Sequence, residues 1–155
     1  IGVVEADRVR NAREAVEYYL SVFPDAKITG ESTYPESADE GLADFQEDFA
    51  GKDLTIDFNL LGQDFTAINA GPEFTFNEAV SFSVFCKDQA EIDYYWGKLS
   101  AHPENEQCGW CKDKFGISWQ IVPSNMGELL SGPVAIQTMM KQKKIIIKEL
   151  EAAGK

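Results

Sequence analysis

The stretch Cys108-Gly-Trp-Cys-Lys-Asp-Lys-Phe-Gly-Ile-Ser-Trp-Gln-Ile-Val-Pro123 carries two predicted strands and the turn that joins them. Asp113–Gly116 contains polar and glycine residues that favour a turn, and it separates strands predicted at Gln107–Cys111 and Ile117–Val122. In the second strand, apolar and polar residues alternate. One face of this strand is therefore expected to pack against a core, and the other to meet water or a cavity.

The same alternation occurs in the strands predicted at Asp53–Leu60 and Val80–Cys86. Their apolar sides are expected to pack on helices, and Trp119 falls on the apolar side of its own strand, which favours a core position. If the sheet curls, the opposite sides of the three strands line a pocket. The residues on those sides are Asp57, Asn59, Ser81, Ser83, Phe85, Ser118 and Gln120.

Two amphipathic helices are predicted at Asn11–Phe23 and Asp88–Ser100. Each has an apolar stripe at helical spacing, and each begins with a capping residue that is followed three positions later by a glutamate. Val16–Leu20 is similar in pattern to Ile92–Trp96, at an offset close to half the chain. The sequence therefore predicts a repeated module in which antiparallel strands follow a helix.

Further strands are predicted at Ala26–Tyr34 and Gln63–Asn69. The second of these is expected to form a hairpin with Asp53–Leu60 around Leu61-Gly62. Because a strand precedes the second helix, symmetry makes Ile1–Val4 the candidate for a strand before the first helix.

An acidic stretch at residues 36–53 is interpreted as a solvated loop with a short helical turn near Leu42–Phe49. Beyond the strands, Ser124–Leu130 and Ser131–Ala153 are predicted to be helices with serine caps. The apolar face of the last helix is expected to contain Ile136, Met139 or Met140, Ile146 or Ile147, and Leu150.

Together these elements predict an α+β fold in a single domain that spans residues 1–155. The domain comprises two modules, at about 1–75 and 76–125, and a C-terminal helical segment at 124–153.

The composition excludes several classes of protein. The net charge of −12 repels phosphate backbones, which argues against nucleic-acid binding. Apolar runs fall short of the roughly 20 residues that span a bilayer, and the apolar content of 44% is too high for a disordered chain. Three cysteines and no recognisable signal peptide favour the reducing cytoplasm.

The sequence contains few of the common catalytic or metal-binding motifs. Cys108-Gly-Trp-Cys111 resembles a redox dithiol, but it is predicted to lie in a strand, which favours two ordinary thiols. His102 is the single histidine, so a zinc site with the three cysteines, or a Ser-His-Asp triad, is disfavoured. Neither a dinucleotide-binding glycine motif nor a phosphate-binding loop is present.

Three parts of the chain resemble one known family. They are Glu14–Tyr19 with Ser21–Ile28, then Phe65–Pro72, and finally Cys108–Trp110 with Asp113–Pro123. These segments are similar to the PhnB-like family, often labelled 3-demethylubiquinone 3-methyltransferase, and the match covers most of residues 12–150. Cys111 stands where this family more often has an aliphatic residue.

The resemblance implies the vicinal oxygen chelate superfamily, together with glyoxalase and bleomycin-resistance proteins. That fold pairs βαβββ modules whose sheets curl around a pocket, usually in a dimer. Its metal-using members carry histidine or glutamate ligands on the strands that face the cavity. By resemblance, Gln120 and Ser81 stand at or near two of those positions, and both are poor ligands. The expected pocket is therefore metal-free.

The methyltransferase label implies a glycine-rich turn between strand and helix for S-adenosylmethionine, and none is visible. We therefore expect a dimeric cytoplasmic protein that binds a small molecule without a cofactor. The alternatives are an enzyme of the same pocket (a methyltransferase, or a metal-dependent lyase, isomerase or dioxygenase) with Asp57 as candidate base, and a resistance protein that sequesters a toxic compound. The predicted pocket residues are Asp57, Asn59, Ser81, Ser83, Phe85, Trp110, Ser118 and Gln120.

Overall fold

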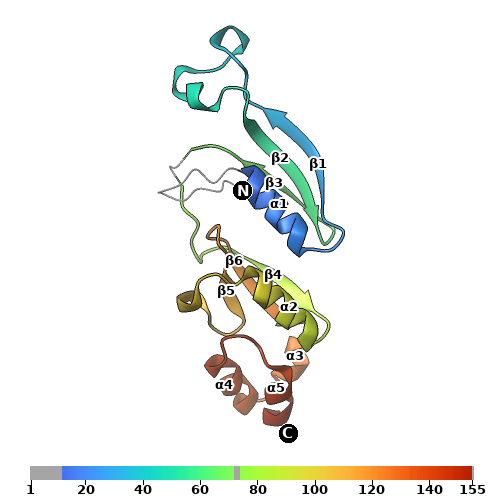
Figure 1. Cartoon of the computed structure of the whole chain (residues 1–155). Coiled ribbons are helices and arrows are strands. Elements are labelled where there is room, and N and C mark those ends of the chain that lie inside the picture. The colour runs from blue at the N-terminus through green and yellow to red at the C-terminus, as the bar shows by residue number, and fades with distance from the viewer. Residues whose placement is uncertain (1–11, 72–73, 155) are drawn as a thin grey trace. The chain divides into compact units, whose positions relative to one another are not determined.

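The computed structural model describes residues 12–71 and 74–154 of the chain (Figure 1). Two compact units form, Ile1–Thr75 and Phe76–Lys155, and each has its own helix packed on its own sheet. The strand predicted at Ile1–Val4 and the capping role predicted for Asn11 lie outside the described residues.

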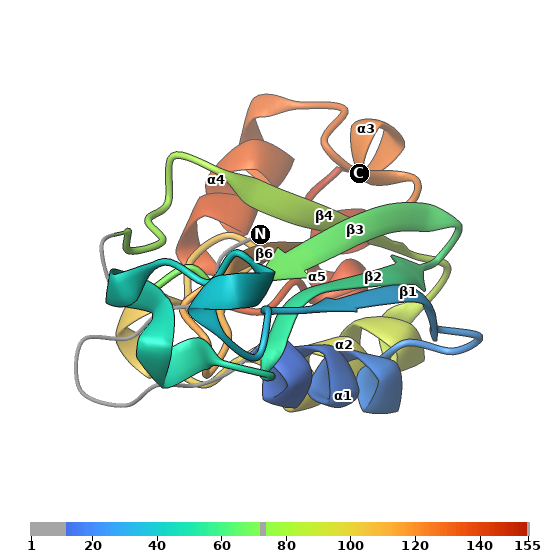
Figure 2. The ribbon, with the colours of Figure 1, turned by 90° about the horizontal axis from the view of Figure 1, so that it is seen from above.

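In the first unit, helix α1 (Ala12–Val22) packs on a sheet of three antiparallel strands. The strands are β1 (Lys27–Thr33), β2 (Asp53–Leu60) and β3 (Gln63–Ile68), in the order β1-β2-β3. Figure 2 shows α1 lying along one face of this sheet. The buried residues between helix and sheet include Ala15, Val16, Tyr19, Ile56, Phe58, Leu60 and Ala67.

The predicted hairpin between β2 and β3 is confirmed. Leu61 and Gly62 have φ angles of 50° and 82°, as the two central residues of a type I′ turn require. Asn59 Oδ1 accepts a hydrogen bond of 3.0 Å from the backbone N–H of Gly62. Upstream of β2, the helical turn predicted near Leu42–Phe49 is a 3₁₀ helix at Asp44–Phe49, preceded by a shorter one at Ala38–Glu40.

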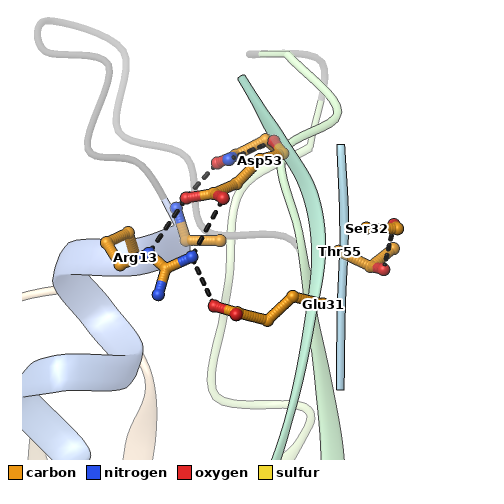
Figure 3. A network of polar contacts seen from close by, with 7 residues as sticks. Arg13, Glu31, Ser32, Asp53 and Thr55 are labelled. Atoms are coloured by element: carbon orange, nitrogen blue, oxygen red, sulfur yellow. Dashed lines mark hydrogen bonds and ion pairs between the residues drawn. The ribbon is translucent and has the colours of Figure 1, made fainter. Parts of the chain in front are cut away.

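Arg13 joins α1 to the sheet through ion pairs (Figure 3). Its Nε and Nη2 donate to the two carboxylate oxygens of Asp53 at 3.0 and 2.9 Å, and Nη2 lies 2.5 Å from a carboxylate oxygen of Glu31. The hydrogen bonds to Asp53, followed by those to Glu31, raise the pKa of Arg13 above its ordinary value. Ser32 and Thr55, whose hydroxyl oxygens are 2.5 Å apart, lie on the other side of the sheet in Figure 3.

In the second unit, helix α2 (Gln89–Leu99) packs on a sheet of mixed direction. The strands are β4 (Ser81–Cys86), β5 (Trp110–Lys112) and β6 (Ser118–Pro123), in the order β4-β6-β5. β4 runs parallel to β6, and β5 runs antiparallel to β6. A 3₁₀ turn at Pro103–Asn105 leads from α2 towards β5, and the buried core includes Val84, Ile92, Tyr95, Leu99, Trp119 and Ile121.

The predicted cap of the second helix is confirmed with one difference in its partner. Asp88 accepts a hydrogen bond of 2.9 Å from the backbone N–H of Glu91. The Glu91 carboxylate accepts in turn from the backbone N–H of Lys87, at 2.9 Å, rather than from that of Asp88. The side chains of Asp88 and Glu91 thus both accept backbone N–H groups near the helix start, as in a capping box. The difference is that Glu91 bonds the residue before the N-cap instead of the N-cap itself.

The prediction of one helix over Ser131–Ala153 is wrong. Helices α3 (Met126–Leu129), α4 (Pro133–Lys141) and α5 (Ile147–Ala153) are separate, and the N-cap of α4 is Gly132 rather than Ser131. Pro133 at the first helical position explains this start, because its missing N–H and fixed φ suit that position.

The break between α4 and α5 has a backbone cause. The carbonyl groups of Gln142 and Lys143 accept hydrogen bonds from the N–H groups of Cys108 and Gly109, at 2.9 and 2.7 Å. The side-chain amide of Gln89 donates to the carbonyl of Ile145 and accepts from the N–H of Ile147, both at 2.9 Å. These bonds, and the poor helix propensity of consecutive isoleucines, hold the segment out of a helix.

The apolar face predicted for the C-terminal segment is only partly confirmed. Leu150 is fully buried, but Ile136 and Met140 are 42% and 60% exposed. Ala135 and Ile145 are buried instead. Across the described residues, no helix combines the length and the apolar character needed to cross a membrane.

Candidate functional site

One face of the sheet in the second unit gathers most of the predicted pocket residues. Registered neighbours in adjacent strands project to the same side. One row contains Ser81, Ser118 and Lys112, and the next contains Ser83, Gln120 and Trp110. Beyond these rows, Phe85 lies in register with Val122. The predicted residues that this face brings together are Ser81, Ser83, Phe85, Trp110, Ser118 and Gln120.

Gln120 and Ser81 are hydrogen-bonded across neighbouring strands. The Nε2 atom of Gln120 lies 2.9 Å from the Oγ of Ser81, and both residues are half-buried. The amide of Gln120 keeps its carbonyl oxygen for another donor, and the hydroxyl of Ser81 keeps its hydrogen. The pair therefore presents one acceptor and one donor at the same place on the sheet.

Ser118 lies between Ser81 and Lys112 and is only 2% exposed. Its Oγ is buried and has no hydrogen-bond partner among the described residues. Most buried polar atoms in folded proteins are hydrogen-bonded, so this one requires an explanation. A ligand that reaches this row would supply the missing partner.

Aromatic side chains flank the polar row. Phe85 is 69% exposed, and Trp110 is half-buried. Trp119 lies on the opposite face, 4% exposed, with its ring centroid 5.6 Å from that of Phe82. The interpretation of Trp119 as a core residue is thus confirmed.

Lys112 is a residue of this face that the sequence patterns did not single out. Its ammonium forms an ion pair with the carboxylate of Glu78, which also accepts a hydrogen bond of 3.2 Å from Asn105. The pKa of Glu78 is held below its ordinary value, first of all by the hydrogen bond from Lys112. Lys112 is two residues from Trp110, so extending the alternation along β5 would have found it.

Asp57 and Asn59 belong to the sheet of the first unit. Asp57 accepts a hydrogen bond of 2.6 Å from Thr66, and Gly30 lies so close that a Cβ there would be 3.0 Å from a carboxylate oxygen of Asp57. An open pocket of about 300 Å³ is lined by Thr29, Asp57, Asp64, Phe65 and Thr66.

Asn59 is largely committed to its own hairpin. Its amide nitrogen donates to Asp64 at 2.7 Å, and its amide oxygen accepts from the N–H of Gly62. This residue is therefore less available to a ligand than Asp57.

The Cys108–Cys111 segment begins with a tight turn. Cys108 and Gly109 have φ angles of 51° and 83° and form a type I′ turn, across which Gln107 and Trp110 exchange two backbone hydrogen bonds. All three cysteines are free, and burial raises the pKa of Cys86 and of Cys111 to about 12. A buried thiol such as Cys111 is poorly reactive, and Cys108 lies in a turn rather than at a helix N-terminus, so both observations agree with the preference for ordinary thiols over a redox dithiol.

The possible metal ligands of the described residues are dispersed. No three histidines, cysteines, aspartates or glutamates among these residues are grouped so as to hold a metal ion. His102 lies at the start of the Pro103–Asn105 turn, with its Nδ1 3.4 Å from a carboxylate oxygen of Glu104.

The architecture of the two units defines the class of protein. Each unit packs a helix on one face of a small sheet, and the chain has the mixed α+β, glyoxalase-like fold expected from its sequence. A family model described as 3-demethylubiquinone-9 3-methyltransferase matches residues 8–122. The chain belongs to this PhnB-like family, and the resemblance recognised in its sequence is confirmed.

Two solved structures are similar to this chain. One is described as a putative 3-demethylubiquinone-9 3-methyltransferase, PhnB protein, from Bacillus cereus: it is 31% identical, with 72% of this chain and 90% of that chain covered and a TM-score of 0.55. The other, a protein from Staphylococcus aureus, is 27% identical, with coverages of 74% and 87% and a TM-score of 0.27. Among curated proteins, none matches the sequence significantly.

Proposed function

We propose that this protein binds a small organic molecule on the polar face of the β4-β6-β5 sheet. The observation that carries the proposal is the convergence of Gln120, Ser81 and Ser118 on that face, with one hydroxyl buried and lacking a partner among the described residues. Polar groups that converge beside aromatic side chains are typical of ligand sites. We further propose that the protein belongs to the vicinal oxygen chelate superfamily, acts as a cytoplasmic homodimer, and forms a single domain of two modules.

Each proposed pocket residue has a role suited to its chemistry. Gln120 and Ser81 orient the polar groups of the ligand, because together they offer a donor and an acceptor. Trp110 and Phe85 supply apolar surface, and Ser83 lies beside Gln120 in the same row. Asp57 and Asn59 are proposed as ligand-binding groups on the sheet of the first unit, where both polar atoms of Asn59 and one carboxylate oxygen of Asp57 already form hydrogen bonds.

The proposed binding does not depend on a metal ion. Neutral amide and hydroxyl oxygens are weak ligands for a divalent cation, and Gln120 and Ser81 are bonded to each other. Metal analysis of the purified protein tests this point. Stoichiometric zinc, nickel or manganese would contradict it and would favour a lyase, isomerase or dioxygenase.

A thermal-shift screen of small molecules tests the proposed site. Gln120→Ala is expected to weaken binding of any ligand found by at least about tenfold, because it removes a donor and an acceptor from the site. Gln137→Ala, on the exposed side of α4, is the matched control and should leave affinity unchanged. Equal affinity in the Gln120 variant and the parent protein would reject this site.

The family description supports one enzymatic alternative, methyl transfer from S-adenosylmethionine. No glycine-rich turn follows a strand of the described residues in the form that usually holds this cofactor. A rise in melting temperature on adding S-adenosylmethionine would favour the alternative, and Asp57→Asn would then test the candidate base. Ligand binding without turnover would favour the sequestering role instead.

A further inference from the structure

We infer that the row formed by Ser81, Ser118 and Lys112 is an anion subsite. The ligand then carries a carboxylate or phosphate group at the end of a flat apolar body. This inference rests on the proposed function, and it specifies the chemical class of the ligand. It is based on the order of side chains in the sheet, the buried hydroxyl of Ser118 and the pairing of Lys112.

The row places two hydroxyl groups and one ammonium group on adjacent strands. Ser81 pairs in register with Ser118 on β6, and Ser118 pairs in register with Lys112 on β5. Neighbouring strands are about 4.8 Å apart, so three such side chains can reach the oxygen atoms of one carboxylate or phosphate. Among the described residues in register on this face, Lys112 is the one cation.

The hydroxyl of Ser118 needs an acceptor. It is buried and has no partner among the described residues, whereas Ser81 accepts the hydrogen bond from Gln120 and keeps a hydrogen to donate. Two hydroxyl donors beside an ammonium match the acceptor oxygens of an anion, which forms stronger hydrogen bonds than a neutral group does.

An anionic ligand can replace Glu78 as the ion-pair partner of Lys112. Its partner Glu78 is 52% exposed, and ion pairs that face solvent are weakly held. The side chain of Lys112 itself is only 19% exposed, so its charge lies in a more protected place. In a chain of net charge −12, an anionic ligand is repelled overall and needs such a local cation to bind.

The second row determines which side chains lie next to the anionic group. Trp110 is two residues from Lys112 along β5, which corresponds to about 7 Å. An anion held beside Lys112 therefore places the adjoining part of the ligand beside Trp110 and Gln120. An indole ring favours a flat apolar body there, and an aromatic carboxylate has these dimensions.

Calorimetric titration with benzoate, phenyl phosphate and the neutral amide benzamide tests the inference. The two anions are expected to bind at least about tenfold more tightly than benzamide, because charge-assisted hydrogen bonds are the stronger ones. Lys112→Met should remove this preference, Lys112→Arg should keep most of it, and Ser118→Ala should reduce it. Glu78→Gln should strengthen binding of the anions, because it releases Lys112. Lys148→Met, which removes an exposed charge from α5, is the matched control and should have no effect.

The outcomes separate this inference from the proposed function. If benzamide binds as tightly as benzoate and Gln120→Ala weakens both, the ligand face stands and the anion subsite is rejected. If benzoate binding is lost in Lys112→Met but unaffected by Gln120→Ala, the anion subsite stands and the assignment of Gln120 is rejected. Absence of binding by both anions at millimolar concentration rejects the subsite, and a neutral ligand found by the screen would still support the proposed function.

Discussion

The carboxylate of Asp113 lies 2.8 Å from the indole nitrogen of Trp119, and Asp113 is completely buried. Its other oxygen accepts the backbone N–H groups of Phe115 and Ile117, at 2.8 and 3.0 Å. One side chain thus fixes both the turn that leads into β6 and a large aromatic residue of the core. Because β6 carries Ser118 and Gln120, this arrangement also sets the position of the candidate site.

Asp113→Asn is expected to lower the free energy of unfolding by about 2 kcal/mol, because the new NH2 group faces a donor in either orientation of the amide: the indole N–H of Trp119 or the backbone N–H groups of Phe115 and Ile117. Urea denaturation followed by fluorescence measures this loss. In a Trp119→Phe background the same change should cost clearly less, since the indole donor is gone. Equal costs in both backgrounds would show that the bond between the two side chains contributes little.

Gly109→Ala is expected to destabilise the protein by about 2 kcal/mol, because an alanine is strained at a φ angle of 83°. Its Cβ would also lie 3.1 Å from the carbonyl oxygen of Ile121 and from the side chain of Ile145. Gly97→Ala is the matched control. Gly97 lies in α2 with open space around it, so this change should raise the free energy of unfolding by about 1 kcal/mol. Thermal unfolding of both variants tests this difference in sign.

Asn69→Ala is expected to lower the free energy of unfolding by about 1–2 kcal/mol, because Asn69 caps the start of α1. Its Oδ1 accepts the N–H of Ala12 and its Nδ2 donates to the carbonyl of Asp53, both at 2.7 Å. Asn125→Ala provides a control, since Asn125 is an N-cap whose side chain makes no capping bond. Similar losses in the two variants, measured by urea denaturation, would contradict this role of Asn69.

Stability is expected to fall as the pH rises above about 9, because burial raises the pKa of Cys86 and of Cys111 to about 12. An unfolded thiol loses its proton near pH 8.5, whereas the buried thiols keep theirs, so alkali favours the unfolded chain with a limiting slope of about 1.4 kcal/mol per pH unit and thiol. This stability is fully present below that pH and is lost towards pH 12.

Cys111→Ala should make this decline shallower, although the variant is less stable at neutral pH. Val84→Ala, a buried position without a titratable group, should lower stability and leave the slope unchanged. Urea denaturation between pH 8 and pH 10.5 distinguishes the two. A slope that stays the same in the Cys111 variant would mean that this thiol does not contribute.

Local patterns predicted much of the fold, because alternation and turn chemistry act over a few residues. Asp53–Leu60 is observed with the expected bounds, and Leu61-Gly62 forms the expected turn. The convergence of Ser81 and Gln120 depends on the parallel pairing of β4 with β6, which are far apart in the sequence. Strand alternation placed both residues on polar strand faces that would share a pocket if the sheet curled, but it did not predict this parallel pairing.

The failures of prediction have a common physical origin in side chains that bond to backbone groups of distant segments. Gln89 and Gln142 look like ordinary polar helix residues, yet their amides bond the backbone at residues 145–147 and help to hold it outside a helix. Asp113 looks like a solvated turn residue, yet three donors surround it. A sequence pattern does not show which distant donors and acceptors will be satisfied in this way.

The backbone N–H groups of Cys108 and Gly109 attach the C-terminal segment to the turn, and this segment lies beyond the residues that the family model matches. Gln107 reinforces the attachment by donating to the carbonyl of Met140 at 2.6 Å. Trp110 comes directly after this turn. Substitutions in these C-terminal helices are therefore expected to shift Trp110, and with it the proposed ligand face, without any change in the proposed pocket residues themselves.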